Sequence, residues 1–203
     1  MNYLGHAVFS PKDDEITLGN LAGDMLKNRF HPLLEEKVLK GVRLHRFIDT
    51  TTDNNVHFRR MVQCFRPHFS KYSPVILDVF IDHLIALHWK KLFEDSYSGY
   101  LNSIYRGILD QSDQLPQPAQ SNISRMAQNQ WLDVYKSREG LIRVFNKLSQ
   151  KIVPTLEVEM VLDIYHRNRG LLDSEFNFFI NEMRQVLQED ELGLSNPRIK
   201  WKS

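Results

Sequence analysis

Apolar residues recur at three- and four-residue steps along most of the chain, which is the spacing of amphipathic α-helices. No segment alternates apolar and polar residues between hairpin turns, as strands with one exposed face do. The pattern predicts an all-α protein with helices over residues 17–28, 33–49, 55–66, 75–93, 97–109, 122–135, 140–150, 155–167 and 171–188.

The predicted helix over residues 75–93 is apolar almost all round, which is typical of a helix at the centre of a fold. A polar stretch with two prolines, residues 110–120, is the one evident loop. The basic end of the chain, residues 196–203, is expected to be frayed. A length of 203 residues fits one domain. We therefore predict a single compact helical bundle over residues 1–203.

Composition narrows the function only a little. The 26 basic and 25 acidic residues leave a net charge of +1, so there is no general attraction to nucleic acid or anionic membranes. Cys64 is the single cysteine, so no internal disulfide can form. We expect Cys64 to be a small buried hydrophobic residue on a helix. The absence of disulfides fits a reducing compartment. The N-terminus lacks a signal-peptide pattern, and no apolar run is long enough to cross a bilayer. We expect a cytoplasmic protein whose partners include neither nucleic acid nor membrane.

Three of the predicted helices carry two polar residues four positions apart, on faces otherwise suited to burial. Buried carboxylates are costly unless they are paired or bound to a metal. Carboxylates and imidazoles that converge between packed helices commonly hold a divalent cation. Without a thiolate, such ligands favour Mg²⁺, Mn²⁺, Fe²⁺ or Zn²⁺. The pairs are Asn20 with Asp24, His45 with Asp49, and Asp78 with Asp82.

Spacing alone leaves a structural interpretation of these residues open. His45 and Asp49 can form an ion pair within one helix, and Asp78 lies in a first turn, where an acid favours the helix dipole. His83 points about a quarter turn away from Asp82, so it joins a site only if that site wraps around the helix. The sequence contains no phosphate-binding glycine loop, CxxC, HExxH or GxSxG motif.

Five short segments occur in a fixed order between residue 1 and about residue 135. They are MNYLGH at 1–6, GNLAGD at 19–24, GVRLHRFID at 41–49 followed by Thr52-Asp53, LDVFIDHL at 77–84, and QWL at 130–132 with Tyr135. In order and spacing they resemble the motifs of the acyl carrier protein phosphodiesterases. Gly5 stands where that family has alanine, and residues 22–25 replace a more aliphatic segment, but the ionisable positions are kept. The last third of the chain is less similar.

The resemblance implies a helical fold related to the HD-type metal phosphohydrolases and a divalent ion, most often Mn²⁺. It implies that holo-acyl carrier protein is the substrate. The implied reaction is hydrolysis of the phosphodiester between 4′-phosphopantetheine and a serine, giving apo-carrier protein and 4′-phosphopantetheine. With the polar pairs, it assigns metal ligands His6, Asp24, His45 and Asp82, catalytic residues Asp49, Asp78 and His83, and substrate-binding residues Asn20, Arg43 and Arg46.

In this assignment Asp49 orients His45 or acts as a base, Asp78 and His83 support the attacking water, and Asn20 binds a phosphoryl oxygen. His6 is assigned from the resemblance alone.

Because acyl carrier proteins are acidic, a basic docking face is expected. A merely solvated helix face is the alternative for each candidate. The candidates are Arg43, Arg46, Arg59, Arg60, Lys90 and Lys91.

Two other functions remain open. The same metal site can serve a nucleotide or another small phosphoester, or the chain can be a non-enzymatic helical binding module whose buried acids and histidines form a structural network.

Overall fold

The computed structural model describes residues 1–151, 156–189 and 196–202. Its α-helices are α1 (Tyr3–Val8), α2 (Asp14–Leu21), α3 (Glu36–Asn54), α4 (Val56–Phe69), α5 (Ser73–Leu87), α6 (Trp89–Leu92), α7 (Tyr97–Gln111), α8 (Ala119–Gln128), α9 (Arg138–Lys151), α10 (Val158–Arg167) and α11 (Arg169–Glu189). Short 3₁₀ helices are η1 (Gly23–Met25), η2 (Asn28–Leu33), η3 (Ser70–Tyr72), η4 (Ser112–Gln114) and η5 (Trp131–Lys136).

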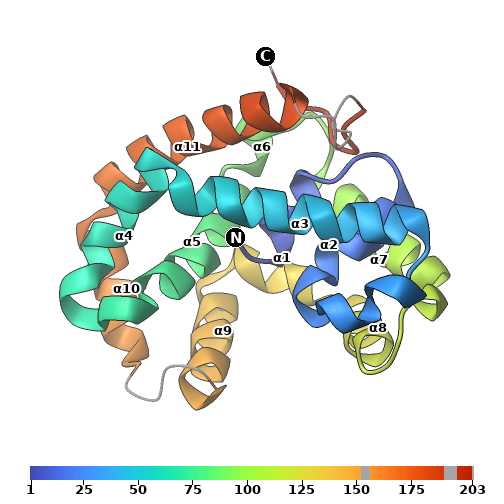
Figure 1. Cartoon of the computed structure of the whole chain (residues 1–203). Helices are drawn as coiled ribbons and strands as arrows, with labels where there is room; N and C mark the ends of the chain where they lie inside the picture. The colour runs from blue at the N-terminus through green and yellow to red at the C-terminus, as the bar shows by residue number, and fades with distance from the viewer. Residues whose placement is uncertain (152–155, 190–195, 203) are drawn as a thin grey trace.

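The prediction of an all-α, single bundle is confirmed. Among the described residues the extended pairings are two isolated bridges, Pro11 with Pro197 and Phe93 with Trp201. The long helices α3 and α11 run across the molecule, while α5 lies among the other helices and the N-terminus lies near the middle of the view (Figure 1). None of the described helices is both long and apolar enough to span a membrane.

Local capping decides several helix boundaries that hydrophobic spacing misplaces. The Asp13 carboxylate accepts hydrogen bonds from the Glu15 and Ile16 N–H groups, so α2 begins before residue 17. Asn55 caps α4 in the same way, and α3 continues to Asn54 rather than ending at residue 49.

Other boundaries differ because short breaks divide long apolar patterns. The predicted helix over residues 75–93 breaks at His88, and that over residues 122–135 becomes α8 followed by η5. The predicted loop is shorter, since α7 reaches Gln111 and α8 begins at Ala119. The predicted helix start at residue 155 lies outside the described residues.

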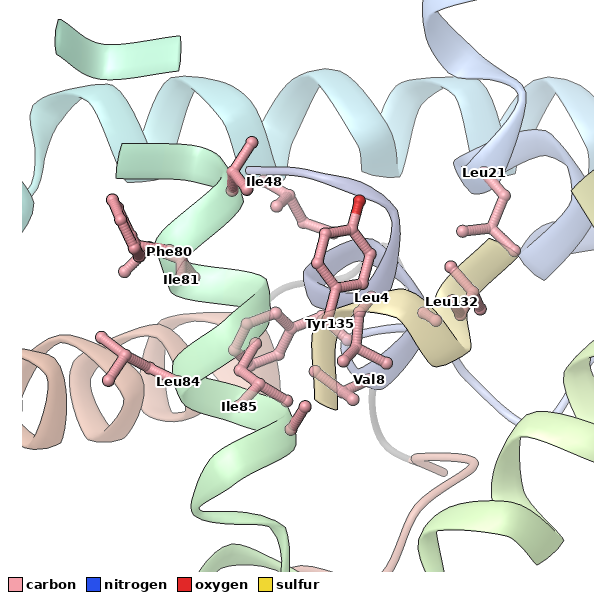
Figure 2. Packing of buried hydrophobic residues seen from close by; sticks show 14 of the residues in the cluster. Leu4, Val8, Leu21, Ile48, Phe80, Ile81, Leu84, Ile85, Leu132 and Tyr135 are labelled. Atoms are coloured by element: carbon pink, nitrogen blue, oxygen red, sulfur yellow. The ribbon is translucent and has the colours of Figure 1, made fainter. Parts of the chain in front are cut away.

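Helix α5 is the centre of the hydrophobic core, as its apolar sequence predicts. Most of its residues are buried, and it contacts α1, α4, α9 and η5. Cys64 on α4 is half-buried against the same core. Figure 2 shows Ile85 of α5 on the side of Leu4, Val8 and Tyr135, while Phe80 and Leu84 project from the opposite side of the helix. There the Phe80 ring stacks on Tyr165 at 4.4 Å.

The C-terminal tail is ordered against the core, so the prediction that it frays is wrong. Ile199 is fully buried. The Trp201 ring stacks on Phe9 at 5.6 Å and meets the Phe93 ring at 4.6 Å. The Arg198 N–H donates to the Ser10 carbonyl at 3.2 Å. The segment is basic overall, but its two apolar side chains, Ile199 and Trp201, anchor it to the core.

Helices α2 and α3 approach backbone to backbone, because glycines face each other there. A Cβ atom added at Gly19 would overlap the Val38 carbonyl group, and one added at Gly41 would overlap the carbonyl oxygen of Ile16. This close approach brings the end of α2 against the middle of α3, where the candidate site lies.

We expect Gly41→Ala to lower the free energy of unfolding by about 1–3 kcal/mol, because the added methyl group forces the two helices apart. Gly170→Ala is the matched control, since a Cβ at that α11 position meets no atom within 4 Å. There the change should be neutral or stabilising by up to about 1 kcal/mol. Urea unfolding measures both, and equal stabilities for the two variants would contradict the close approach.

Candidate metal centre

Two histidines and a carboxylate meet where α1, α2 and α3 converge. His6 comes from α1, while His45 and Asp49 lie one turn apart on α3. One possible ligand atom from each lies within 4.8 Å of the others. His6 and His45 are buried, and Asp49 is half-buried. The His6 and His45 imidazole rings stack, with their centroids 4.1 Å apart and an angle of 16° between the ring planes.

Asn20 determines which nitrogen of each ring carries a proton. Its Nδ2 group donates to the His6 carbonyl oxygen at 2.9 Å, so its Oδ1 atom faces His6 Nδ1, also at 2.9 Å. Because Oδ1 can only accept, His6 Nδ1 is the donor. His45 Nδ1 donates to the Asn20 backbone carbonyl at 2.8 Å. In a neutral ring, Nε2 is then the unprotonated nitrogen, free to bind a metal.

Both Nε2 atoms lie close to carboxylate oxygens. His6 Nε2 lies 3.1 Å from Asp49 Oδ1, yet it is buried and makes no hydrogen bond with any described residue. His45 Nε2 lies 3.2 Å from Asp49 Oδ2 and 3.3 Å from Asp24 Oδ1. A lone pair facing a carboxylate is unfavourable unless a proton or a cation lies between them. This donor set of imidazole nitrogens and carboxylate oxygens fits Mn²⁺, Fe²⁺ or Zn²⁺.

The charged groups of the cluster strongly shift one another's pKa values. Burial alone would lower the pKa of His45, but Asp24 and Asp49 raise that pKa to about 9. Burial lowers the pKa of His6, despite the Asp49 carboxylate. Burial opposes ionisation of Asp49, yet the two histidines hold its pKa far below the ordinary value. The cluster therefore binds one proton or one cation readily, whereas protonation of both stacked imidazole rings would make them repel each other.

Gly23 is required for the position of the His45 ring. A Cβ atom at Gly23 would overlap the imidazole carbons of His45. Gly23 begins η1, which turns the chain so that Asp24 faces His45. The Asp24 side chain is 89% exposed, against 38% for Asp49, so Asp24 marks the open side of the cluster.

Asp82, a predicted ligand, lies outside the group formed by His6, His45 and Asp49. Its Oδ2 and Oδ1 atoms accept hydrogen bonds from the backbone N–H groups of Leu4 at 2.7 Å and Gly5 at 2.9 Å. Complete burial raises the pKa of Asp82 to about 7, even though these two N–H groups lower it. Asp82 thus holds the first turn of α1, and through it the position of His6.

Asp78 is separated from the cluster by the N-terminal ammonium group. The Met1 nitrogen lies 3.1 Å from Asp78 Oδ1 and 3.5 Å from Asp49 Oδ1. Burial raises the pKa of Asp78 to about 6, although the nearby ammonium group opposes that shift. The sequence pattern gave no sign that the ammonium group joins the two carboxylates, because a backbone terminus has no hydropathy signal.

Of the remaining predicted residues, one lies in the interior and two lie at the surface. His83 is buried and directed away, with Nδ1 2.8 Å from the Tyr135 carbonyl oxygen and its ring edge-on to Tyr165. Arg43 and Arg46 are exposed on α3. The Arg46 guanidinium donates to Asn28 Oδ1 at 2.7 Å.

We predict that Mn²⁺ stabilises the protein. A ligand at one hundred times its dissociation constant raises the free energy of unfolding by about 2.7 kcal/mol. His45→Gln removes an imidazole ligand with little change in volume and should reduce the shift in unfolding temperature. Thermal unfolding with Mn²⁺ and with a chelator measures the effect. Identical curves for the unchanged protein in the two conditions would contradict a metal centre.

For Asp82→Asn we expect the free energy of unfolding to fall by about 1–3 kcal/mol, because one buried N–H group loses its acceptor. Asp163→Asn, an exposed change on α10, is the control and should alter stability by about 0.5 kcal/mol or less. Mn²⁺ affinity should fall less in Asp82→Asn than in His45→Gln. The reverse order would make Asp82 a ligand.

An all-α bundle with a histidine–carboxylate cluster between its helices is typical of helical metal-dependent hydrolases. The family model for acyl carrier protein phosphodiesterases matches residues 1–183, and this chain belongs to that family. No solved structure matches the chain. A relation to the HD-type phosphohydrolases therefore stays a prediction.

Curated relatives carry the same description. The acyl carrier protein phosphodiesterase of Pectobacterium atrosepticum is 27% identical over 150 residues, 73% of this chain and 78% of the relative. That of Klebsiella pneumoniae subsp. pneumoniae is 26% identical over 197 residues, covering 95% of this chain and 100% of the relative. That of Enterobacter sp. (strain 638) is 28% identical over 156 residues, with 74% and 79% covered.

Proposed function

We propose that this protein hydrolyses the phosphodiester between 4′-phosphopantetheine and a serine of holo-acyl carrier protein. Water adds to phosphorus, the P–O bond to the serine breaks, and the serine oxygen takes up a proton. The products are apo-carrier protein and 4′-phosphopantetheine. The observation that carries the proposal is the cluster of His6, His45 and Asp49 in a chain of this family. A cytoplasmic location, which the lone Cys64 favours, belongs to the same proposal.

In this proposal His6, His45 and Asp49 hold a divalent ion, with Asp24 as a fourth ligand at the open side. When bound, such an ion neutralises charge on phosphoryl oxygens and lets water act as a nucleophile near neutral pH. Asp24 and Asp49 by themselves would repel a phosphodiester anion. A cation at the cluster removes that repulsion, which is a physical reason to expect Mn²⁺ or a similar ion here.

The supporting residues act through position rather than contact with phosphate. Asn20 is fully buried, and its side chain bonds His6 and Ser10, so it orients an imidazole instead of binding a phosphoryl oxygen as the sequence suggested. Asp82 fixes α1. Instead of supporting the attacking water, Asp78 holds the Met1 ammonium group beside Asp49, and we propose no chemical role for His83.

The acidic carrier protein would approach the open side of the cluster. Arg43 and Arg46 are exposed on the same helix as His45 and Asp49. Complementary charge at such a face raises the rate of encounter and fixes orientation. Of the other basic candidates, Arg60 is paired with Glu175 at 3.5 Å and Lys91 bonds Asn177 at 3.2 Å. Arg46 also bonds Asn28, so the position of Arg43 and Arg46 on the helix of His45 and Asp49, and not freedom from hydrogen bonds, favours them for docking.

We predict that His45→Gln lowers hydrolysis of holo-carrier protein about a thousandfold or more, since a metal ligand contributes several kcal/mol to transition-state stabilisation. His166→Gln, at an exposed position on α10, is the matched control and should leave the rate unchanged. Incubation with Mn²⁺ followed by intact mass of the carrier protein reports loss of the prosthetic group.

The same assay separates the alternatives. Turnover of small phosphodiesters with no loss of the prosthetic group would replace the carrier protein by a small phosphoester. A protein that hydrolyses neither substrate and binds no divalent ion would be a binding module. Full activity in His45→Gln would overturn the proposed site.

A further inference from the structure

A pocket of about 260 Å³ opens between the start of α1, η5 and α9. Its exposed lining is mostly apolar, and it contains no carboxylate. Two basic residues, Arg143 and Lys147, are exposed at its edge. The lining residues are Asn2, Tyr3, Trp131, Val134, Tyr135, Arg143, Val144 and Lys147.

The N-terminal residues connect the pocket to the candidate metal centre. The Met1 nitrogen is 3.5 Å from Asp49, and the next two residues line the pocket. Because a chain spans at most about 3.6 Å per residue, the pocket wall begins on the order of 10 Å from the cluster. Tyr3 also lies three positions before His6 on α1, on the same helix face. Burial and the Asp24 charge both raise the pKa of Tyr3.

We propose that this pocket binds the pantetheine arm of the substrate while its phosphodiester lies at the metal centre. The inference rests on the proposed function. It assigns the residues that recognise the part of the substrate released as 4′-phosphopantetheine. The arm is long and slender, with a geminal dimethyl group at the phosphate end and two amides beyond it. The dimethyl group packs on Tyr3 and Trp131, and amide oxygens accept hydrogen bonds from Arg143 and Lys147.

The size and polarity of the pocket fit this occupant. Sites for drug-sized molecules measure about 300–1,000 Å³, so a pocket of about 260 Å³ suits a small, slender ligand. A cationic ligand would meet Arg143 and Lys147 with no acid to balance them. Lys147 already lies over the Trp131 ring, 4.6 Å from its centroid, so the basic edge and aromatic wall form one surface.

The test is Val144→Trp, which fills the pocket from α9. With Mn²⁺ present, kcat/KM is measured for holo-carrier protein and for bis(p-nitrophenyl) phosphate, a diester without an arm. We expect the loss on holo-carrier protein to exceed the loss on the small diester by tenfold or more. Free pantetheine should inhibit the unchanged protein competitively and inhibit Val144→Trp at least tenfold more weakly. Val186→Trp, an exposed valine on α11, is the matched control and should change neither substrate's kinetics.

Equal losses of the variant on the two substrates would overturn the arm pocket. The proposed function would still stand if the unchanged protein turned over holo-carrier protein. Turnover of the small diester alone would instead defeat the proposed function. Inhibition by apo-carrier protein but not by pantetheine would assign the pocket to a carrier side chain and overturn this inference. Should Val144→Trp fail to fold, Trp131→Ala, which removes the aromatic wall at a half-buried position, must show the same tenfold difference between substrates.

Discussion

The orientation of both imidazoles depends on one buried residue, Asn20. Its side-chain oxygen accepts from His6 Nδ1, and its backbone oxygen accepts from His45 Nδ1. These bonds fix the ring planes and leave each Nε2 atom facing Asp49. Asn20 itself satisfies its remaining donors on the His6 carbonyl and the Ser10 hydroxyl group. A polar group at this depth is tolerated because each of its hydrogen-bonding atoms has a partner.

Asn20 can reach both rings only because the helices around it lie close together. Gly19 and Gly41 bring α2 onto α3, and Gly23 leaves space for the His45 ring. The third element, α1, is held by Asp82 from the central helix, whose two oxygens accept successive backbone N–H groups. The hydrophobic core and the cluster are therefore built on the same helices. Core packing thus sets the distances between the candidate ligands, as a rigid metal site would require.

The cluster also illustrates how buried charge is retained. Asp49 is balanced by His6, His45 and the Met1 ammonium group, and this explains its depressed pKa. Asp82 is completely buried and accepts hydrogen bonds from two backbone N–H groups, and its pKa is raised because burial outweighs these bonds and the more distant Met1 ammonium group. The two acids thus differ because Asp49 is held directly by cationic groups, whereas burial dominates at Asp82.

Sequence alone determined the helical fold, the central position of α5 and the presence of His45 and Asp49 on one face of α3, since a helical period of 3.6 residues fixes which side chains share a face. It did not determine that α2 ends at Leu21, so that Asp24 reaches His45 from η1 and not from the helix of Asn20. Nor did it determine that Asp82 and His83 turn toward α1 and Tyr135, or that the tail packs on Phe9. Those contacts join residues far apart in the chain. Periodicity describes one helix at a time, so only the packing of helices against each other decides which polar groups share a site.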